Sequence, residues 1–103
     1  MAQYNKLVRD RIPEILDAKG VSYERNTATE DEYRTALIVK LLEETAEFEE
    51  AGAVEELADV LEVVAALREL PEYSDVELIR KQKRDERGGF EGRIILKGDD
   101  DSR

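Results

Sequence analysis

Two short acidic clusters contain the residues of this sequence that are best suited to chemistry. Glu44 and Glu47 lie three residues apart in the first cluster, and Glu56 and Asp59 repeat that spacing in the second. Because residues three apart share one face of a helix, each pair would present two carboxylates to the same side. Carboxylates held close together repel one another unless a cation lies among them. The two pairs therefore predict a site for a hard divalent metal ion.

The composition decides which metal and which catalytic groups are available. The sequence has no His and no Cys, so all side-chain ligands would be oxygen atoms, which favours Mg²⁺ or Mn²⁺ over zinc. Mg²⁺ typically binds through a few carboxylates together with substrate phosphates. Without His, catalysis would rely on carboxylates, Lys, Tyr, Ser or water. This set of residues fits phosphate chemistry supported by Mg²⁺.

Two predicted helices carry the acidic pairs. The first runs from about residue 30 to 51 and follows Thr29, which forms a capping-box pattern with Glu32. The second runs from about residue 54 to 70. Because only the region of Gly52 separates them, we expect an antiparallel two-helix hairpin that brings both acidic pairs together.

The remaining segments predict a mostly α fold. A helix is expected to begin at an Asp10 cap, and another to begin at a Ser74 capping box and to end at Gly88. Residues 93–97, Arg-Ile-Ile-Leu-Lys, predict a short C-terminal strand. The fold class is therefore a helical bundle built on the hairpin. A chain this small is expected to complete its core by oligomerisation.

One acid of each pair falls in the apolar row of its helix. At about 100° per residue, Glu44 and Glu56 lie in these core-facing rows, whereas Glu47 and Asp59 lie on the flanks. The apolar rows consist of Leu37, Leu41 and Phe48 in the first helix, and Val60, Val63 and Leu67 in the second. A buried carboxylate is costly, so it requires protonation, an Arg or Lys partner, or a metal ion.

A purely structural interpretation also exists for these acids. Of the 103 residues, 26 are acidic, so carboxylates three apart arise by chance, and most charged residues on helices are solvated. The matched placement of an acid in the apolar row of two successive helices counts against this interpretation.

Length and charge limit the remaining possibilities. The 103 residues fit one domain, expected over residues 1–97, followed by a disordered acidic tail over residues 98–103. A formal net charge of −10 argues against a nucleic-acid polymer as partner. The sequence shows no signal peptide and no apolar run long enough to span a membrane. We therefore expect no membrane partner and a cytoplasmic location.

The acidic motifs resemble the signature of a known family. Residues 44–47, Glu-Thr-Ala-Glu, followed by residues 56–59, Glu-Leu-Ala-Asp, resemble the ExxE…ExxD motif of the MazG-like all-α nucleoside triphosphate pyrophosphohydrolases. Residues 4–14 are similar to the opening of a small subgroup labelled phosphoribosyl-ATP pyrophosphohydrolase-like, and residues 81–90 are similar to its close. The resemblance spans nearly the whole chain.

This resemblance implies a fold, a reaction and a set of site residues. It implies a helical bundle that works as a dimer or tetramer and binds Mg²⁺ through Glu44, Glu47, Glu56 and Asp59. The implied reaction splits a nucleoside triphosphate between its α and β phosphorus atoms, giving a monophosphate and pyrophosphate. Only eight residues separate Glu47 from Glu56. An insertion that could read the base is therefore absent, and the identity of the nucleotide stays open.

Further residues are candidates for catalysis and substrate binding. Glu43, beside the catalytic candidates Glu44 and Glu47, would orient the attacking water or help to hold a second metal ion, or would be a solvated surface acid. Lys40 would contact a phosphate oxygen or pair with Glu44. The cations proposed to contact the substrate are Lys6, Arg9, Lys40, Lys81, Lys83 and Arg84. The last three would alternatively stabilise a helix C-terminus.

Three functions are consistent with these observations. The first is a Mg²⁺-dependent nucleotide pyrophosphohydrolase that removes unwanted nucleotides. The second is the same reaction on phosphoribosyl-ATP. The third is an acidic helical binding module without turnover, although such a module gains nothing from carboxylates in a core row.

Overall fold

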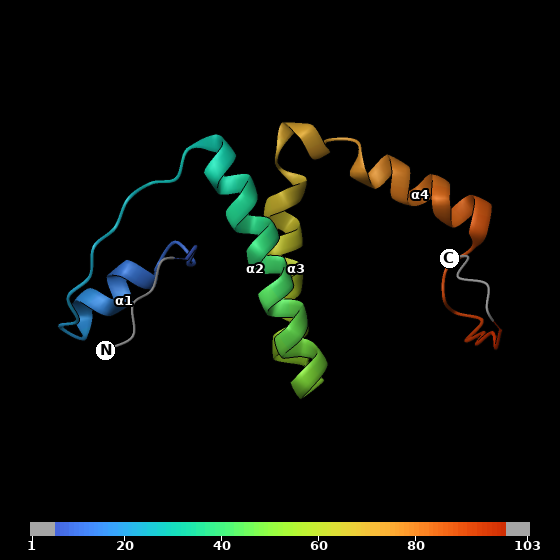
Figure 1. Ribbon diagram of the computed structural model, residues 1–103, viewed down its shortest axis with the longest axis horizontal. Coiled ribbons are helices and arrows are strands. Elements are labelled where there is room, and N and C mark those ends of the chain that lie inside the picture. Colours follow the sequence, from blue (N-terminus) through green and yellow to red (C-terminus); the bar gives the residue numbers. More distant parts are fainter. Residues whose placement is uncertain (1–5, 99–103) are drawn as a thin grey trace. The chain divides into compact units, whose positions relative to one another are not determined.

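The computed structural model describes residues 6–98 and is mostly helical (Figure 1). Tyr4, Asn5 and the predicted tail from Asp99 onward lie outside the described residues. The elements are α1 (Ile12–Ala18), α2 (Glu30–Ala51), α3 (Val54–Arg68), a 3₁₀ helix η1 (Pro71–Tyr73) and α4 (Val76–Arg87). The chain divides into two compact units, Met1–Tyr73 and Ser74–Arg103. A single domain over residues 1–97 stays a prediction.

The ends of α2 are set by local chemistry, and both predicted limits are confirmed. The side chain of Thr29 accepts a hydrogen bond from the backbone N–H of Glu32 at 3.2 Å, and the Glu32 carboxylate accepts one from the Thr29 N–H at 2.9 Å. These bonds satisfy donors that the first helical turn leaves unpaired. The bond from the Thr29 N–H to the Glu32 carboxylate also holds the pKa of Glu32 below its usual value. At the other end, Gly52 adopts φ +63°, which favours glycine and ends the helix.

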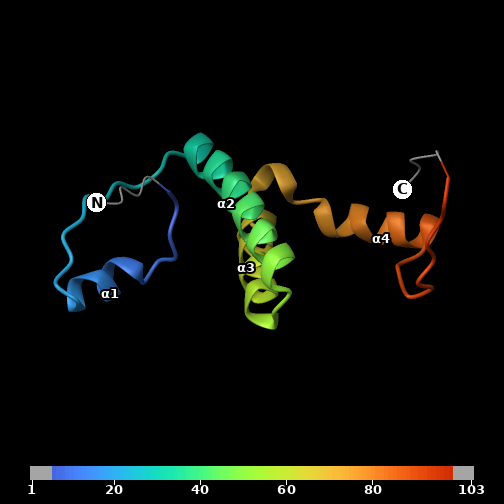
Figure 2. The same cartoon turned by 60° about the horizontal axis from the view of Figure 1, so that its bottom comes forward.

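Helices α2 and α3 pack against each other and run in opposite directions, joined by Gly52 and Ala53 (Figures 1 and 2). The core between them is small. Among the residues that the structure describes, the buried hydrophobic side chains are Leu37 on α2, 3% exposed, and Val63 on α3, 7% exposed. Both belong to the apolar rows expected from the sequence, so the helical periodicity correctly identified the contact faces.

Three predicted helix ends differ from the structure. The N-cap of α1 is Arg11, and that of α4 is Asp75, so the caps predicted at Asp10 and Ser74 are wrong. Neither helix start has a side-chain capping bond. Helix α3 ends at Arg68, two residues before the predicted limit, because the chain turns into η1. Short capping patterns are common in polar sequence. Whether such a residue actually caps the helix depends on the path of the chain before the helix.

The strand predicted over residues 93–97 is wrong. No strand occurs within residues 6–98, and Arg93 has a positive φ of 57°. A strand requires a second extended segment that accepts and donates its backbone hydrogen bonds. The described part of the chain offers none to this segment, and its apolar side chains are largely exposed: Ile94, Ile95 and Leu96.

The α2–α3 pair exposes apolar side chains in addition to its buried ones. Leu42 on α2 is 66% exposed, and Leu61 on α3 is 60% exposed. The other exposed large apolar residues of this pair are Ile38, Val39, Val54 and Leu57. None of the described helices is long and apolar enough to cross a membrane.

Candidate functional site

The predicted site acids lie near the connection between α2 and α3. Glu47 belongs to the last turns of α2, and Glu56 and Asp59 to the first turns of α3. Because the helices run in opposite directions across a short connection, these segments lie next to each other. A shallow hollow of about 410 Å³ is lined by Glu47, Glu50, Ala51, Glu56 and Asp59. Three of the four predicted metal-binding acids therefore line one hollow.

Glu44 is the buried member of the acidic cluster. The residue is only 7% exposed, as its place in the apolar row of α2 predicted. The Nζ atom of Lys40 lies 3.4 Å from Glu44 Oε1 and 3.5 Å from Glu43 Oε2. The other oxygen, Glu44 Oε2, is buried without a hydrogen-bond partner. A buried acceptor without a partner is costly, so this oxygen is a position where a cation or a donor would be stabilising.

The charge of Glu44 acts on its neighbour Glu47. Glu47 is exposed and lies three residues further along α2. Repulsion from Glu44, together with desolvation, raises the pKa of Glu47 above its ordinary value of 4.5. Asp59 adds to the rise, whereas Lys40 opposes it. A carboxyl group with a raised pKa is a better proton acceptor near neutral pH.

Asp59 is held by a residue from outside the two helices. The Nη2 atom of Arg9 donates to Asp59 Oδ1 at 2.7 Å. Arg9 precedes α1 and lies 50 residues from Asp59 in the sequence. Both side chains stay substantially exposed, 57% for Arg9 and 42% for Asp59. The N-terminal segment is thereby connected to the edge of the acidic hollow.

The acids lie near one another, but their side chains do not converge on a single point. Within residues 6–98, no three acidic side chains form a group that could hold a metal ion as they stand. Glu44 is turned to Lys40, and Asp59 is turned to Arg9. The donor set nevertheless fits Mg²⁺ in its chemistry, because it consists of carboxylate oxygens and includes the unpartnered Glu44 Oε2. Side-chain rotation would be required to bring the acids together.

The predicted substrate-binding cations are divided between the two units. Lys6, Arg9 and Lys40 belong to the first unit, in which Arg9 and Lys40 each contact a site acid. Lys81, Lys83 and Arg84 are exposed on α4 in the second unit, so their part in the site stays a prediction. Arg84 donates to Glu91 at 2.7 Å, which lowers the pKa of that carboxyl group.

One acidic residue that lines the hollow was absent from the predicted site. Glu50 lines the same hollow as Glu47 and follows it by three residues on α2. The i, i+3 rule that paired Glu44 with Glu47 also places Glu50 beside Glu47. The sequence signal was therefore present, but it extended beyond the four-residue motif.

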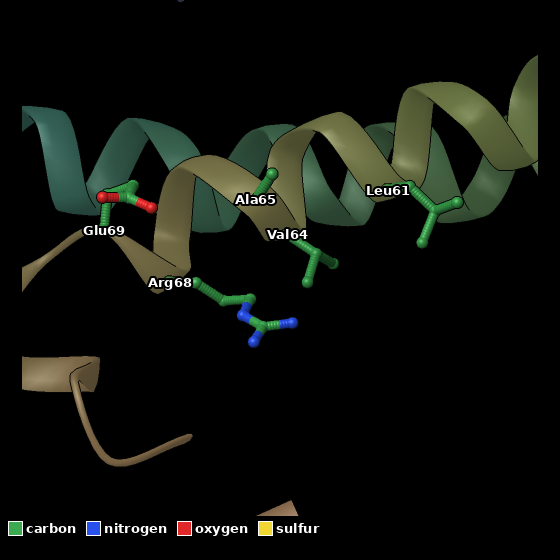
Figure 3. Close-up of a pocket in the computed structure, with 5 residues that line it drawn as sticks. All are labelled: Leu61, Val64, Ala65, Arg68 and Glu69. Carbon is green, nitrogen blue, oxygen red and sulfur yellow. The ribbon is translucent and has the colours of Figure 1, made fainter. Parts of the chain in front are cut away.

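A second hollow lies elsewhere on α3. It measures about 290 Å³ and is lined by Leu61, Val64, Ala65, Arg68 and Glu69. Figure 3 shows Leu61, Val64 and Arg68 projecting to the same side of the helix. None of the predicted site residues lines this hollow, so the acidic hollow is the candidate site.

Comparisons with known proteins leave the family open. The chain matches no protein-family profile and no solved structure. An uncharacterized protein of Mycolicibacterium smegmatis is 50% identical over 46 residues, which cover 45% of this chain and 47% of that protein. The chain thus matches slightly less than half the length of this relative. The resemblance to the MazG-like family is carried by the sequence motifs alone.

Proposed function

We propose that this protein is a Mg²⁺-dependent nucleotide pyrophosphohydrolase, which cleaves a nucleoside triphosphate between its α and β phosphates. The observation that carries this proposal is the buried Glu44 carboxylate, whose Oε2 atom has no hydrogen-bond partner. It lies one helical turn from Glu47, which lines a hollow together with Glu56 and Asp59. A buried oxygen without a partner destabilises the fold. The same oxygen would be stabilising as a ligand to a bound cation.

The residues that would hold Mg²⁺ are Glu44, Glu47, Glu56 and Asp59. When bound, the ion would polarise a phosphoryl oxygen and reduce the negative charge of the triphosphate. Glu47 would accept the proton of the attacking water, because its raised pKa brings it closer to neutral pH. Glu43, one residue before Glu44, would orient that water through Oε1, the carboxylate oxygen that does not contact Lys40.

Cations of the first unit would hold the substrate phosphates. Lys40 is already positioned between Glu43 and Glu44, where a phosphate oxygen next to the acids would meet its ammonium group. Arg9 lies beside Asp59 and could grip a phosphate with two parallel hydrogen bonds. Without such donors, the charge of the protein and that of a triphosphate would repel each other, since the net charge of the chain is −10.

Pyrophosphate release from a panel of nucleoside triphosphates with Mg²⁺ tests this proposal. We expect at least one nucleotide to be cleaved, and we expect Glu56→Gln to abolish the release. The matched control is Glu55→Gln, an exposed acid one position earlier on α3, which should retain activity. No pyrophosphate from the panel or from phosphoribosyl-ATP would contradict the proposal.

The two alternative functions make different predictions in the same assay. Cleavage of phosphoribosyl-ATP alone would assign the reaction to that substrate. Absence of any turnover, together with tight binding of another macromolecule, would favour the acidic binding module. The unpartnered Glu44 oxygen favours the enzyme, since a binding surface has no use for a buried carboxylate.

Self-association as a dimer or tetramer belongs to this proposal. The exposed apolar residues of α2 and α3 support it, because two helices alone bury only Leu37 and Val63 among the described hydrophobic side chains. A helix bundle formed with a second copy would cover Leu42 and Leu61 and would complete the core. Sedimentation of the wild type and of Leu42→Lys would test this, and a wild-type monomer would contradict it. We also propose a cytoplasmic location.

A further inference from the structure

Two cations of the same chain pair with acids at or next to the acidic hollow, Arg9 with Asp59 in its lining and Lys40 with Glu43 and Glu44 one helical turn away. Lys40 contacts Glu43 and Glu44 from within α2, four residues or fewer away. Arg9 contacts Asp59 from a segment 50 residues distant. The first contact is local and persists wherever α2 is helical. The second contact exists only while the N-terminal segment lies against α3.

Arg9 and a divalent ion would compete for the same carboxylate oxygen. The guanidinium lies 2.7 Å from Asp59 Oδ1, which is too close for a metal ion to coordinate that oxygen along the same direction. The ion pair is substantially exposed, with Arg9 57% and Asp59 42% accessible. Exposed ion pairs of this kind are weak, so a divalent ion can displace the guanidinium.

We infer that Arg9 is a displaceable counter-ion: it holds the N-terminal segment on Asp59 in the ion-free protein, and cation binding at Asp59 releases that segment. This inference rests on the proposed metal site. It accounts for the orientation of one acid among those that do not converge in the described structure, because Asp59 is turned to Arg9. Once released, the guanidinium becomes available to an incoming phosphate at the same place.

Two variants of one segment distinguish this role from a general charge effect. Arg9→Gln removes the competing cation. Arg11→Gln removes an equal charge two residues away, from an exposed side chain that contacts Glu14 of α1. If Arg9 competes with the metal, Mn²⁺ should bind Arg9→Gln roughly two- to five-fold more tightly than the wild type. The Mn²⁺ affinity of Arg11→Gln should equal that of the wild type.

Two measurements on the full chain provide the readouts, and neither depends on turnover. Mn²⁺ binding is followed by the electron paramagnetic resonance signal of the free ion. Backbone order of residues 7–11 is followed by ¹⁵N heteronuclear NOE values with and without Mg²⁺. In the wild type these NOE values should fall when Mg²⁺ is added. In Arg9→Gln they should be low at the start and should not change.

The possible failures separate the inference from the proposed function. If the wild type binds Mn²⁺ and Asp59→Asn abolishes binding, but Arg9→Gln has wild-type affinity, then the counter-ion role is overturned and the metal site stands. Unchanged NOE values on Mg²⁺ binding would overturn it in the same way. If the wild type binds no Mn²⁺ at millimolar concentration, the metal site and the counter-ion role are both overturned.

Discussion

The ammonium group of Lys40 lies 3.4 Å from one oxygen of the buried Glu44 carboxylate, while the other oxygen of that carboxylate has no hydrogen-bond partner. This half-satisfied arrangement costs stability in the protein as it stands, because a buried charge requires full compensation. The same arrangement leaves an acceptor ready for a cation. Stability and the proposed activity therefore place opposite demands on this residue.

Replacing Glu44 by an apolar residue of similar size should make the protein more stable and inactive. Glu44→Met removes the unpartnered oxygen, and Lys40 keeps its contact with Glu43. We expect a gain of about 1 kcal/mol in the free energy of unfolding, or roughly 4–8 °C in the midpoint of thermal unfolding. Glu49→Met, at an exposed position of α2, is the control and should change little. A large loss of stability in Glu44→Met would contradict this account of the site.

The raised pKa of Glu47 should make the stability depend on pH. A carboxyl group whose pKa is raised by folding binds protons more readily in the folded state, so its penalty is present above the folded pKa. The penalty disappears as the pH falls through the folded pKa toward the ordinary value of 4.5. Glu47→Gln should thus be more stable than the wild type at neutral pH, and the difference should shrink on acidification. Denaturant unfolding of both proteins at several pH values measures this difference, and a constant or widening gap would refute it.

Magnesium should stabilise the wild type against heat. A ligand that binds only the folded state adds about 2.7 kcal/mol when its free concentration is a hundred times the dissociation constant. Sodium chloride at matched ionic strength is the necessary control, because any salt screens the repulsion within a chain of net charge −10. Asp59→Asn should lose the specific part of the effect. A melting temperature that responds equally to both salts would argue against a metal site.

The cap of α2 should contribute measurably to stability. Thr29→Ala removes the hydroxyl that accepts from the Glu32 N–H at 3.2 Å, and we expect a loss of about 1 kcal/mol. Thr27 precedes Glu30 by the same three residues but is not the N-cap in the structure. Thr27→Ala should therefore unfold at the wild-type urea concentration. Equal losses in both variants would show that the cap is placed incorrectly.

Helix and strand predictions succeeded where the element depends on interactions between residues close in sequence, and failed where it needs a distant segment. The limits of α2 were predictable because Thr29 and Gly52 act on backbone groups within one turn of themselves. The strand expected over residues 93–97 was wrong because β-branched side chains indicate only a preference. A strand also needs a neighbouring segment, which no local pattern can report.

The sequence by itself determined which acids share a helix face and which of them lie in apolar rows, because a helix repeats at a constant angle per residue. That reasoning placed Glu44 at the helix contact, and the structure confirms its burial. Only the tertiary structure decided that Glu56, in the equivalent row of α3, is partly exposed, and that Asp59 pairs with Arg9. The reason is physical: burial and ion pairing depend on how closely two helices approach and on where a distant segment passes. Neither quantity is contained in the period of a single helix.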